Sequence, residues 1–255
     1  MHPRYKLVIA DVDGTIFPPS EFPSPKPSEK LTKAVERARK KGVAFSIASG
    51  RSLSWVEEII KGLELDTPII LDNVARIYYC RKKQYVWESL LIKKTAEKVL
   101  AVLKKDKALR VFIADDDERL SGKAKITKWK ISKILVLGVT PEKAEKLHRG
   151  LKVIPDIHVT KSVSGTGEKS QSVHVTNINA TKQVAVGKLL EILKLKKEQV
   201  IGIGDSYNDF PLLLSCGLKV AMENAMPEIK EIAYYIASSY EEEGVVKVLE
   251  KFILK

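Results

Sequence analysis

Short apolar runs alternate with helical stripes of apolar residues through the first third of the chain. Residues 7–10, 43–48 and 68–71 are apolar runs of the length expected for buried strands. Between these runs the apolar positions recur three and four residues apart, as in amphipathic helices: Leu31, Ala34, Val35 and Ala38, then Leu53, Val56, Ile60 and Leu63. The order strand, helix, strand, helix, strand predicts a parallel sheet with helices packed on its faces.

The same alternation returns near the C-terminal end, but the middle of the chain has a different pattern. A helix is expected from Thr181, a strand over residues 200–204, and a last amphipathic helix with Val245, Leu249 and Phe252. Between them the pattern predicts a mixed set of helices and strands: a helix over 93–104, strands over 110–114 and 131–137, a helix over 141–150, and strands over 153–160 and 172–176 joined by a hairpin turn at 165–170. We therefore predict an α/β core with a doubly wound parallel sheet (residues 1–89 and 177–255) and an inserted α+β domain (residues 90–176).

Composition is that of a globular protein with excess positive charge. Hydrophobic residues make up 44% of the 255 positions and charged residues 30%, which excludes a disordered or fibrous chain. Lysine and arginine total 44 against 32 acidic residues, a net charge of +12. The insert alone holds 19 basic and 10 acidic residues, so most of the excess lies there. A basic protein suggests an anionic partner, which could be nucleic acid, a membrane surface or a phosphorylated small molecule.

The lengths of the apolar runs and the number of cysteines indicate the cellular compartment in which the protein is expected. No apolar run is long enough for a signal peptide or a membrane span. Two cysteines, Cys80 and Cys216, are too few for a disulfide framework and are expected to be buried apolar residues. We therefore expect a cytoplasmic protein that does not contact the membrane.

Carboxylates follow two of the predicted strands. The first strand ends in Asp11-Val12-Asp13-Gly14-Thr15, and the strand over 200–204 ends in Asp205-Ser206-Tyr207-Asn208-Asp209. Ligands bind at the carboxyl ends of strands in open α/β sheets, and close carboxylates repel unless a cation or a shared proton relieves them. Oxygen donors from two strand ends suit Mg²⁺.

Two further features are weaker evidence for a binding site when each is taken alone. Ser49-Gly50-Arg51 follows the second strand and begins a helix, where a hydroxyl and backbone N–H groups can hold an anion. Lys182 begins the helix after the insert, although a lone lysine is most often a solvated surface charge. The acidic run Asp115–Glu118 in the insert is read as a solvated loop, with a second cation site as the alternative.

These four features, in this order, resemble the motifs of the haloacid dehalogenase superfamily of phosphotransferases. The first motif of that family reads DxDGT, the second is a Ser or Thr after the second strand, the third is a lysine, and the fourth is GDxxND. They correspond to Asp11–Thr15, Ser49, Lys182 and Gly204–Asp209. The position of the insert is similar to the cap of the Cof-type branch, which includes phosphoglycolate, sucrose-phosphate and mannosyl-3-phosphoglycerate phosphatases. Asn73 lies where many relatives have Asn-Gly-Ala, but Val74 replaces the glycine.

The resemblance implies a magnesium-dependent phosphatase. Asp11 would be the nucleophile that forms an aspartyl-phosphate, and Asp13 would be the general acid and base. Mg²⁺ would be held by Asp11, the Asp13 carbonyl and Asp205, with Asn208 and Asp209 orienting the metal site and Lys182. Ser49, the Gly50 amide and Lys182 would hold the phosphate, while Arg51 and Thr15 are candidates to contact the substrate. The insert would cover and select a small phosphorylated metabolite.

Three alternatives stay open. A mutase would return the phosphoryl group to a sugar instead of water. A degenerate relative would bind without catalysis, which the intact acidic residues argue against. A nucleic-acid-binding protein would use the basic insert, where lysines surround Trp129 (Lys123, Lys125, Lys128, Lys130 and Lys133), but no recognised binding motif accompanies them.

Overall fold

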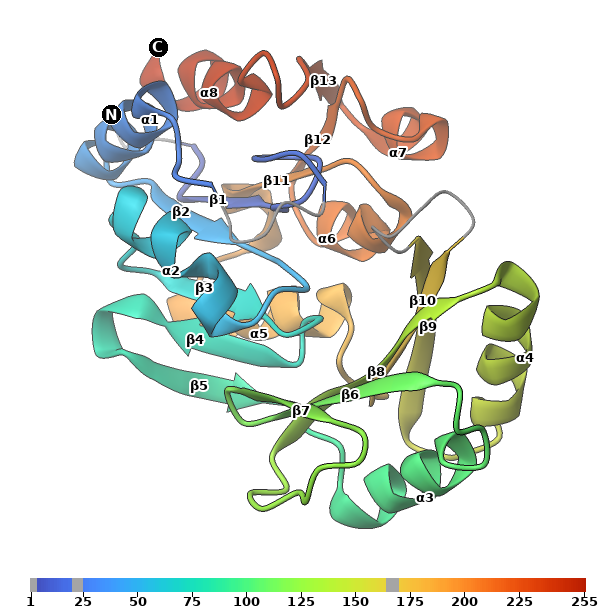
Figure 1. Ribbon diagram of the computed structural model, residues 1–255. Helices are drawn as coiled ribbons and strands as arrows, with labels where there is room; N and C mark the ends of the chain where they lie inside the picture. The colour runs from blue at the N-terminus through green and yellow to red at the C-terminus, as the bar shows by residue number, and fades with distance from the viewer. Residues whose placement is uncertain (1–3, 20–24, 164–169) are drawn as a thin grey trace. The chain divides into compact units, whose positions relative to one another are not determined.

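The chain forms two compact units in the computed structural model, which describes residues 4–19, 25–163 and 170–255 (Figure 1). Unit 1 contains Met1–Trp87 and Thr181–Lys255, and unit 2 is Glu88–Ala180. Most of the hairpin turn expected at 165–170 lies outside the described residues. Each unit has its own hydrophobic core.

The centre of unit 1 is a five-stranded parallel sheet with the strand order β13-β12-β11-β1-β2. Strands β1 and β11 are neighbours in this sheet, with Leu7 opposite Val200 and Ala10 opposite Ile203. Because the two strands run parallel, they end at the same edge of the sheet. This sheet confirms the α/β prediction. The five strands are β1 (Leu7–Ala10), β2 (Ala44–Ile47), β11 (Val200–Gly204), β12 (Leu218–Met222) and β13 (Tyr235–Ala237).

Helices cover both faces of this sheet and bury its inner strands β1 and β11 completely. One core cluster joins Val8 and Ile201 to α1 and α8, and a second joins Leu7 and Val200 to α5 and α6. The Ser28 hydroxyl accepts from the Leu31 N–H at 3.0 Å and caps α1, as the sequence predicts. The helices of unit 1 are α1 (Glu29–Lys40), α2 (Leu53–Gly62), α5 (Lys182–Leu193), α6 (Phe210–Leu214), α7 (Pro227–Ile232) and α8 (Gly244–Leu249), the last continuing as a π-helical turn at Glu250–Leu254.

The third strand expected at 68–71 is present as β3, and it also belongs to a separate three-stranded sheet that the sequence pattern did not predict. Ala48, the residue after β2, forms a parallel bridge with Ile70 in β3 (Pro68–Leu71), and β3 pairs antiparallel with β4 (Arg76–Tyr79). A third strand, β5 (Gln84–Glu88), completes this sheet. The sequence pattern missed β4 and β5 because their apolar runs are short and lie between polar residues.

Unit 2 is an antiparallel sheet with two helices on one face. The strand order is β7-β6-β8-β10-β9, and the core contains residues of both helices together with alternate residues of the strands. The elements are α3 (Lys93–Leu103), β6 (Arg110–Asp115), β7 (Glu118–Ser121), β8 (Ile131–Val139), α4 (Pro141–Leu151), β9 (Ile157–Val163) and β10 (Gln171–Asn177). The expected strand at 153–160 begins too early: Val153 is 82% exposed, and the left-handed Asp156 (φ 64°) keeps this segment in a turn.

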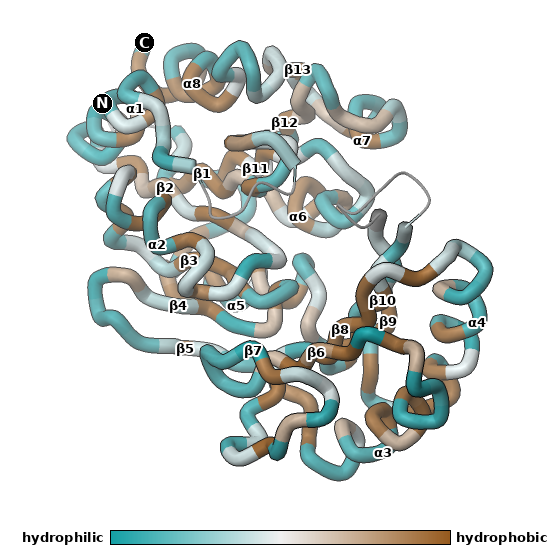
Figure 2. Tube along the Cα trace, in the orientation of Figure 1, coloured by the Kyte–Doolittle hydropathy of each residue, from teal (hydrophilic) through white to brown (hydrophobic). Residues whose placement is uncertain are grey.

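Hydrophobic residues gather along the strands in both units, and the outward turns of helices such as α1 are hydrophilic (Figure 2). Cys80 and Cys216 are free and buried, as expected. Within the described residues, no helix has the length and apolar character needed to cross a membrane.

Candidate active site

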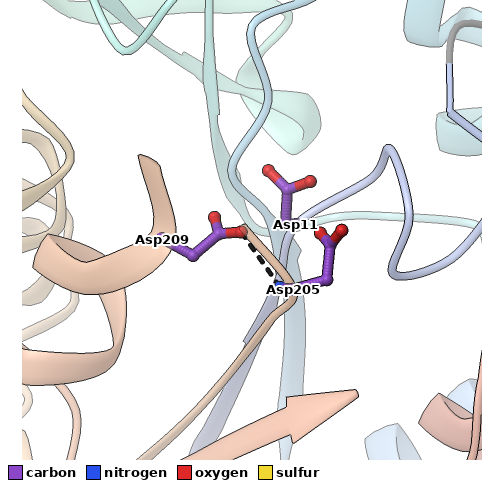
Figure 3. A group of neighbouring side chains, drawn as sticks. All are labelled: Asp11, Asp205 and Asp209. Atoms are coloured by element: carbon purple, nitrogen blue, oxygen red, sulfur yellow. Dashed lines mark hydrogen bonds between the residues drawn. The ribbon is translucent and has the colours of Figure 1, made fainter. Parts of the chain in front are cut away.

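The carboxylates predicted at the strand ends come together at one edge of the sheet in unit 1. Asp11 follows β1, and its N–H donates to Ile203 in β11 at 2.9 Å, so it lies beside the end of the strand that leads to Asp205. Figure 3 shows Asp11, Asp205 and Asp209 with their carboxyl groups close together. One ligand oxygen from each of the three lies within 4.8 Å of the others. This arrangement follows directly from the register of β1 and β11.

Lys182 lies among these carboxylates and not at the surface. It is the first residue of α5, which Thr181 caps by accepting from the Val184 N–H at 3.2 Å. Its Nζ donates to Asp11 Oδ1 at 2.6 Å and also to Asp209 Oδ1. All three side chains are nearly inaccessible to solvent. We name Asp11, Lys182, Asp205 and Asp209 the strand-end cluster.

The strand-end cluster concentrates charge in a buried space. Burial and the neighbouring Asp209 raise the pKa of Asp11 well above its usual range, although Lys182 acts in the opposite direction. Burial and Asp209 likewise raise the pKa of Asp205 to about 7. Burial alone would lower the pKa of Lys182, but Asp11 and Asp209 outweigh it and raise that pKa above the usual value. The lysine is therefore charged, and the carboxylates around it repel one another.

Asp209 connects the two halves of the cluster. One of its oxygens contacts Lys182. The other accepts from the Asp205 N–H at 3.1 Å, the dashed line in Figure 3, and from the Ser206 N–H at 3.0 Å. Asn208, the other residue predicted to orient the site, is exposed, and its Oδ1 accepts from the Ser206 hydroxyl at 2.6 Å. Asp209 therefore fixes both the lysine and the loop that carries Asp205, while Asn208 braces that loop.

Asp13 is paired with Arg51. The Arg51 guanidinium donates to Asp13 Oδ1 at 2.6 Å and to Oδ2 at 3.2 Å, which is a bidentate pair. Arg51 is 6% exposed and Asp13 is 36% exposed. The Arg51 N–H donates to the Ser49 hydroxyl at 3.1 Å, and Gly50 between them is exposed. Arg51, predicted as a possible substrate contact, thus joins the Ser49–Arg51 loop to Asp13.

The turn after Asp13 fits closely against Asp205. Gly14 has φ +82°, and a Cβ at this position would lie 2.3 Å from Asp205 Oδ2, so only glycine fits. The Thr15 hydroxyl, a candidate substrate contact, is buried and donates to Asp205 Oδ1 at 3.3 Å. Asn224 Nδ2 donates to the Gly14 carbonyl at 2.8 Å. These contacts fix the Asp205 carboxyl group.

The donors of the strand-end cluster fit a divalent cation. Three carboxylates face one ammonium group, so full ionisation leaves negative charge in excess, and hard oxygen donors are those that Mg²⁺ prefers. Because both oxygens of Asp209 are engaged by Lys182 and by backbone N–H groups, Asp11 and Asp205 are the carboxylates best placed to hold the ion.

Sequence reasoning missed Asn224 near the site, and it noted Asn73 without giving it a role. Asn224 lies just after β12, so the rule that ligands gather at strand ends could have found it. Asn73 lies against Gly50: a Cβ on that glycine would be 2.6 Å from Asn73 Oδ1. The resemblance marked Asn73, but its contact with Gly50 could not be predicted, because it depends on the turn between β3 and β4.

The sequence matches a known protein family that has been found by comparison. The profile of the haloacid dehalogenase-like hydrolases matches residues 8–133 and 120–249. The chain belongs to this family. The resemblance noted from the four motifs is therefore confirmed, and the protein is an enzyme of the hydrolase class.

Curated relatives of this hydrolase match along nearly its whole length. It is 27% identical to a 5-amino-6-(5-phospho-D-ribitylamino)uracil phosphatase of Bacillus subtilis, covering 98% of this chain and 96% of the relative. It is also 27% identical to a phosphoglycolate phosphatase of Saccharolobus solfataricus, covering 97% and 96%. A solved structure from Thermotoga maritima has a TM-score of 0.80 at 23% identity, covering 97% of each chain, which confirms the fold.

Proposed function

We propose that the protein hydrolyses a small phosphate monoester, of the sugar phosphate or phosphoglycolate type, with Asp11 as the nucleophile. The observation that carries the proposal is the contact of Lys182 with Asp11 inside the strand-end cluster. A buried carboxylate held by a buried ammonium group is a fixed nucleophile beside a group that can bind phosphate oxygens. The relatives named as phosphatases support this assignment.

In the first step the Asp11 carboxylate attacks phosphorus, and the bond from phosphorus to the alcohol oxygen breaks. Asp13 gives its proton to that oxygen, so the alcohol leaves neutral. In the structure Arg51 holds both Asp13 oxygens, so this transfer requires the Asp13–Arg51 pair to open. Lys182, the Ser49 hydroxyl and the Gly50 N–H are proposed to hold the phosphate oxygens.

In the second step Asp13 takes a proton from water as the water oxygen attacks phosphorus. The bond between phosphorus and Asp11 breaks, which restores the carboxylate and releases inorganic phosphate. Mg²⁺, held by Asp11, Asp205 and the carbonyl of Asp13, would reduce the repulsion between an anionic nucleophile and an anionic substrate. Asp209 and Thr15 keep Lys182 and Asp205 in place through both steps.

We also propose that unit 2 selects the substrate. Its excess of basic residues raises the local concentration of an anionic ester, which supports this role. Two groups near Trp129 are engaged inside the unit: Lys128 pairs with Glu118 at 3.0 Å, and Lys93 Nζ lies 4.6 Å from the centre of the Trp129 ring. These contacts favour a small substrate over nucleic acid. Replacing Lys123, Lys125 and Lys133 with Met should raise KM more than it lowers kcat, and an unchanged KM would remove this role.

The proposed function is tested by the Asp11→Asn variant in hydrolysis of an aryl phosphate with Mg²⁺. We expect kcat to fall by about 10³-fold or more, since the amide cannot act as the nucleophile. Asp66→Asn, an exposed aspartate that pairs with Arg81, is the matched control and should keep full activity. Retained hydrolysis by Asp11→Asn would disprove the assignment. With a sugar phosphate as substrate, free inorganic phosphate supports a phosphatase, whereas an isomeric sugar phosphate supports a mutase.

A further inference from the structure

The turn between β3 and β4 is strained next to the loop proposed to bind phosphate. Asp72, Asn73 and Val74 are consecutive non-glycine residues with φ of 57°, 51° and 64°. The left-handed region is unfavourable for L-residues, most of all for a β-branched residue such as Val74. Strain of this kind persists only where the surrounding structure enforces it, and it concentrates at functional sites.

Buried side chains on either side of Asn73 hold this turn in its strained conformation. Asp72 is 1% exposed and Arg76 is fully buried, with 3.7 Å between their carboxylate and guanidinium groups. The Arg76 guanidinium lies 4.6 Å from the centre of the Tyr85 ring. The Val74 side chain is packed in a core cluster with Leu7 and Ile77. Side chains on both sides of Asn73 are thus buried, while Asn73 itself is partly exposed.

Backbone contacts hold the turn against the Ser49–Arg51 loop. The Asp72 N–H donates to the Arg51 carbonyl at 2.9 Å, and the Ser49 N–H donates to the Ile70 carbonyl at 2.9 Å. Between these two bonds, the Asn73 side chain lies so close to Gly50 that an added Cβ would come within 2.6 Å of Asn73 Oδ1. The φ of Gly50 is not in the left-handed region, and Asn73 is the residue that a side chain at position 50 would meet.

We propose that Asn73 is a positioning residue for the proposed phosphatase reaction: the strained turn presses its side chain against Gly50 and thereby fixes the direction of the Gly50 N–H. This inference rests on the proposed function, in which that N–H holds a phosphate oxygen. An N–H fixed in advance stabilises the charge of the transferring phosphoryl group most strongly in the transition state. Its loss therefore lowers kcat for every substrate alike and changes KM little.

The test is a double-mutant cycle of Asn73→Gly and Gly50→Ala. Glycine at position 73 removes the side chain without adding backbone strain, since it adopts positive φ freely. Alanine at position 50 keeps the N–H but displaces the Asn73 side chain. Lys83→Gly, another exposed left-handed position, and Gly150→Ala, where a Cβ meets nothing within 4 Å, are the matched controls.

We expect each single variant to lower kcat by about fivefold or more on both an aryl phosphate and phosphoglycolate, with KM nearly unchanged. The double variant should be no slower than Asn73→Gly alone, because the side chain that obstructs the added methyl group is gone. Additive losses, an unchanged kcat, or a change of KM with only one substrate would overturn the inference. If Gly50→Ala does not fold, the kcat and KM values of Asn73→Gly decide alone.

The same hydrolysis assay distinguishes a failure of this inference from a failure of the proposed function. Hydrolysis by the unmodified enzyme that is lost in Asp11→Asn but kept in Asn73→Gly contradicts only the role of Asn73. Absence of Asp11-dependent hydrolysis in the unmodified enzyme contradicts the proposed function and, with it, the inference.

Discussion

Each unit of this molecule contains a cluster of acidic residues, and the two clusters differ in what the buried carboxylates contact. In the strand-end cluster of unit 1, the carboxylates of Asp11 and Asp209 share one buried ammonium group and lie beside Asp205. In the run Asp115–Glu118 of unit 2, which we call the acidic hairpin, Asp115 is equally buried, but its oxygens accept from the Lys128 and Lys130 N–H groups at 3.0 and 2.8 Å.

The comparison shows that burial of a carboxylate is not by itself a sign of function. Asp115 closes a hairpin and is satisfied by backbone donors, so no cation is needed there. The expectation that the whole acidic run is solvated is therefore wrong for Asp115. In the strand-end cluster the carboxylates face one another, and the pKa of Asp205 rises to about 7 as a result of burial and of Asp209. Mutual repulsion in addition to burial distinguishes the proposed catalytic cluster from Asp115.

The largest expected effect comes from removing the charge at the centre of the strand-end cluster. Lys182→Met should lower kcat on an aryl phosphate by about 10²–10³-fold, because the phosphate oxygens lose a buried cation. It should also destabilise the protein by about 3–5 kcal/mol, because the carboxylates lose their partner. Lys188→Met on the same helix, an exposed residue paired with Glu191, is the control and should change neither quantity. Equal activities of the two variants would remove Lys182 from the site.

Addition of Mg²⁺ should separate the two acidic clusters. At a concentration about 100-fold above Kd the ion stabilises the folded state by about 2.7 kcal/mol, which corresponds to a Tm increase of about 5–10 °C. Asp205→Asn should abolish the increase measured by thermal unfolding, whereas Asp115→Asn should keep it. An increase that survives in Asp205→Asn but not in Asp115→Asn would reverse our assignment of the metal site.

A smaller effect is expected for the stability of the acidic hairpin. Asp115→Asn replaces one acceptor oxygen with an amide N–H₂ that faces a backbone N–H, at a cost of about 1–3 kcal/mol. Denaturant unfolding should show this loss, while kcat on an aryl phosphate stays unchanged. Asp117→Asn, in the turn of the same hairpin, is the control. A large loss of kcat would mean that the hairpin takes part in catalysis.

The last expected effect is a pH dependence of the metal-free protein. The folded-state pKa of Asp205 is about 7, above its value in an unfolded chain, so the folded state binds the proton more tightly. Stability contributed by this proton is present at low pH and is lost as pH rises from about 4 to about 7. In a chelating buffer, the Tm of Asp205→Asn relative to the unmodified protein should therefore be higher at pH 8 than at pH 5. Comparison of the two proteins removes the contribution of the histidines, and a pH-independent difference would contradict the raised pKa.

Local sequence patterns predicted the features that depend on neighbouring residues. The parallel sheet, the cap of α1 and the family membership are confirmed. The meeting of the two carboxylate motifs could be predicted because strand ends in a parallel sheet share an edge. The burial of Lys182 needed the resemblance, because nothing in the composition around a lone lysine indicates which carboxylates it will meet.

Features that depend on contacts between distant segments could not be predicted. Strand β4 contains the fully buried Arg76, whose burial depends on Asp72 and Tyr85, so the apolar pattern fails there. The pairing of Arg51 with Asp13 joins loops that follow different strands. The contact between Asn73 and Gly50 depends on three left-handed residues that no turn rule would assign to Asp, Asn and Val in sequence.

The most direct test of the central claim, that Asp11 is the nucleophile of the strand-end cluster, is chemical trapping during turnover. Borohydride added to the enzyme with an aryl phosphate and Mg²⁺ reduces an acyl phosphate, which converts the aspartate that carries it to homoserine. We expect homoserine at position 11 in the peptide map and nowhere else. Homoserine at Asp205 or Asp209, or rapid turnover with none at Asp11, would contradict it.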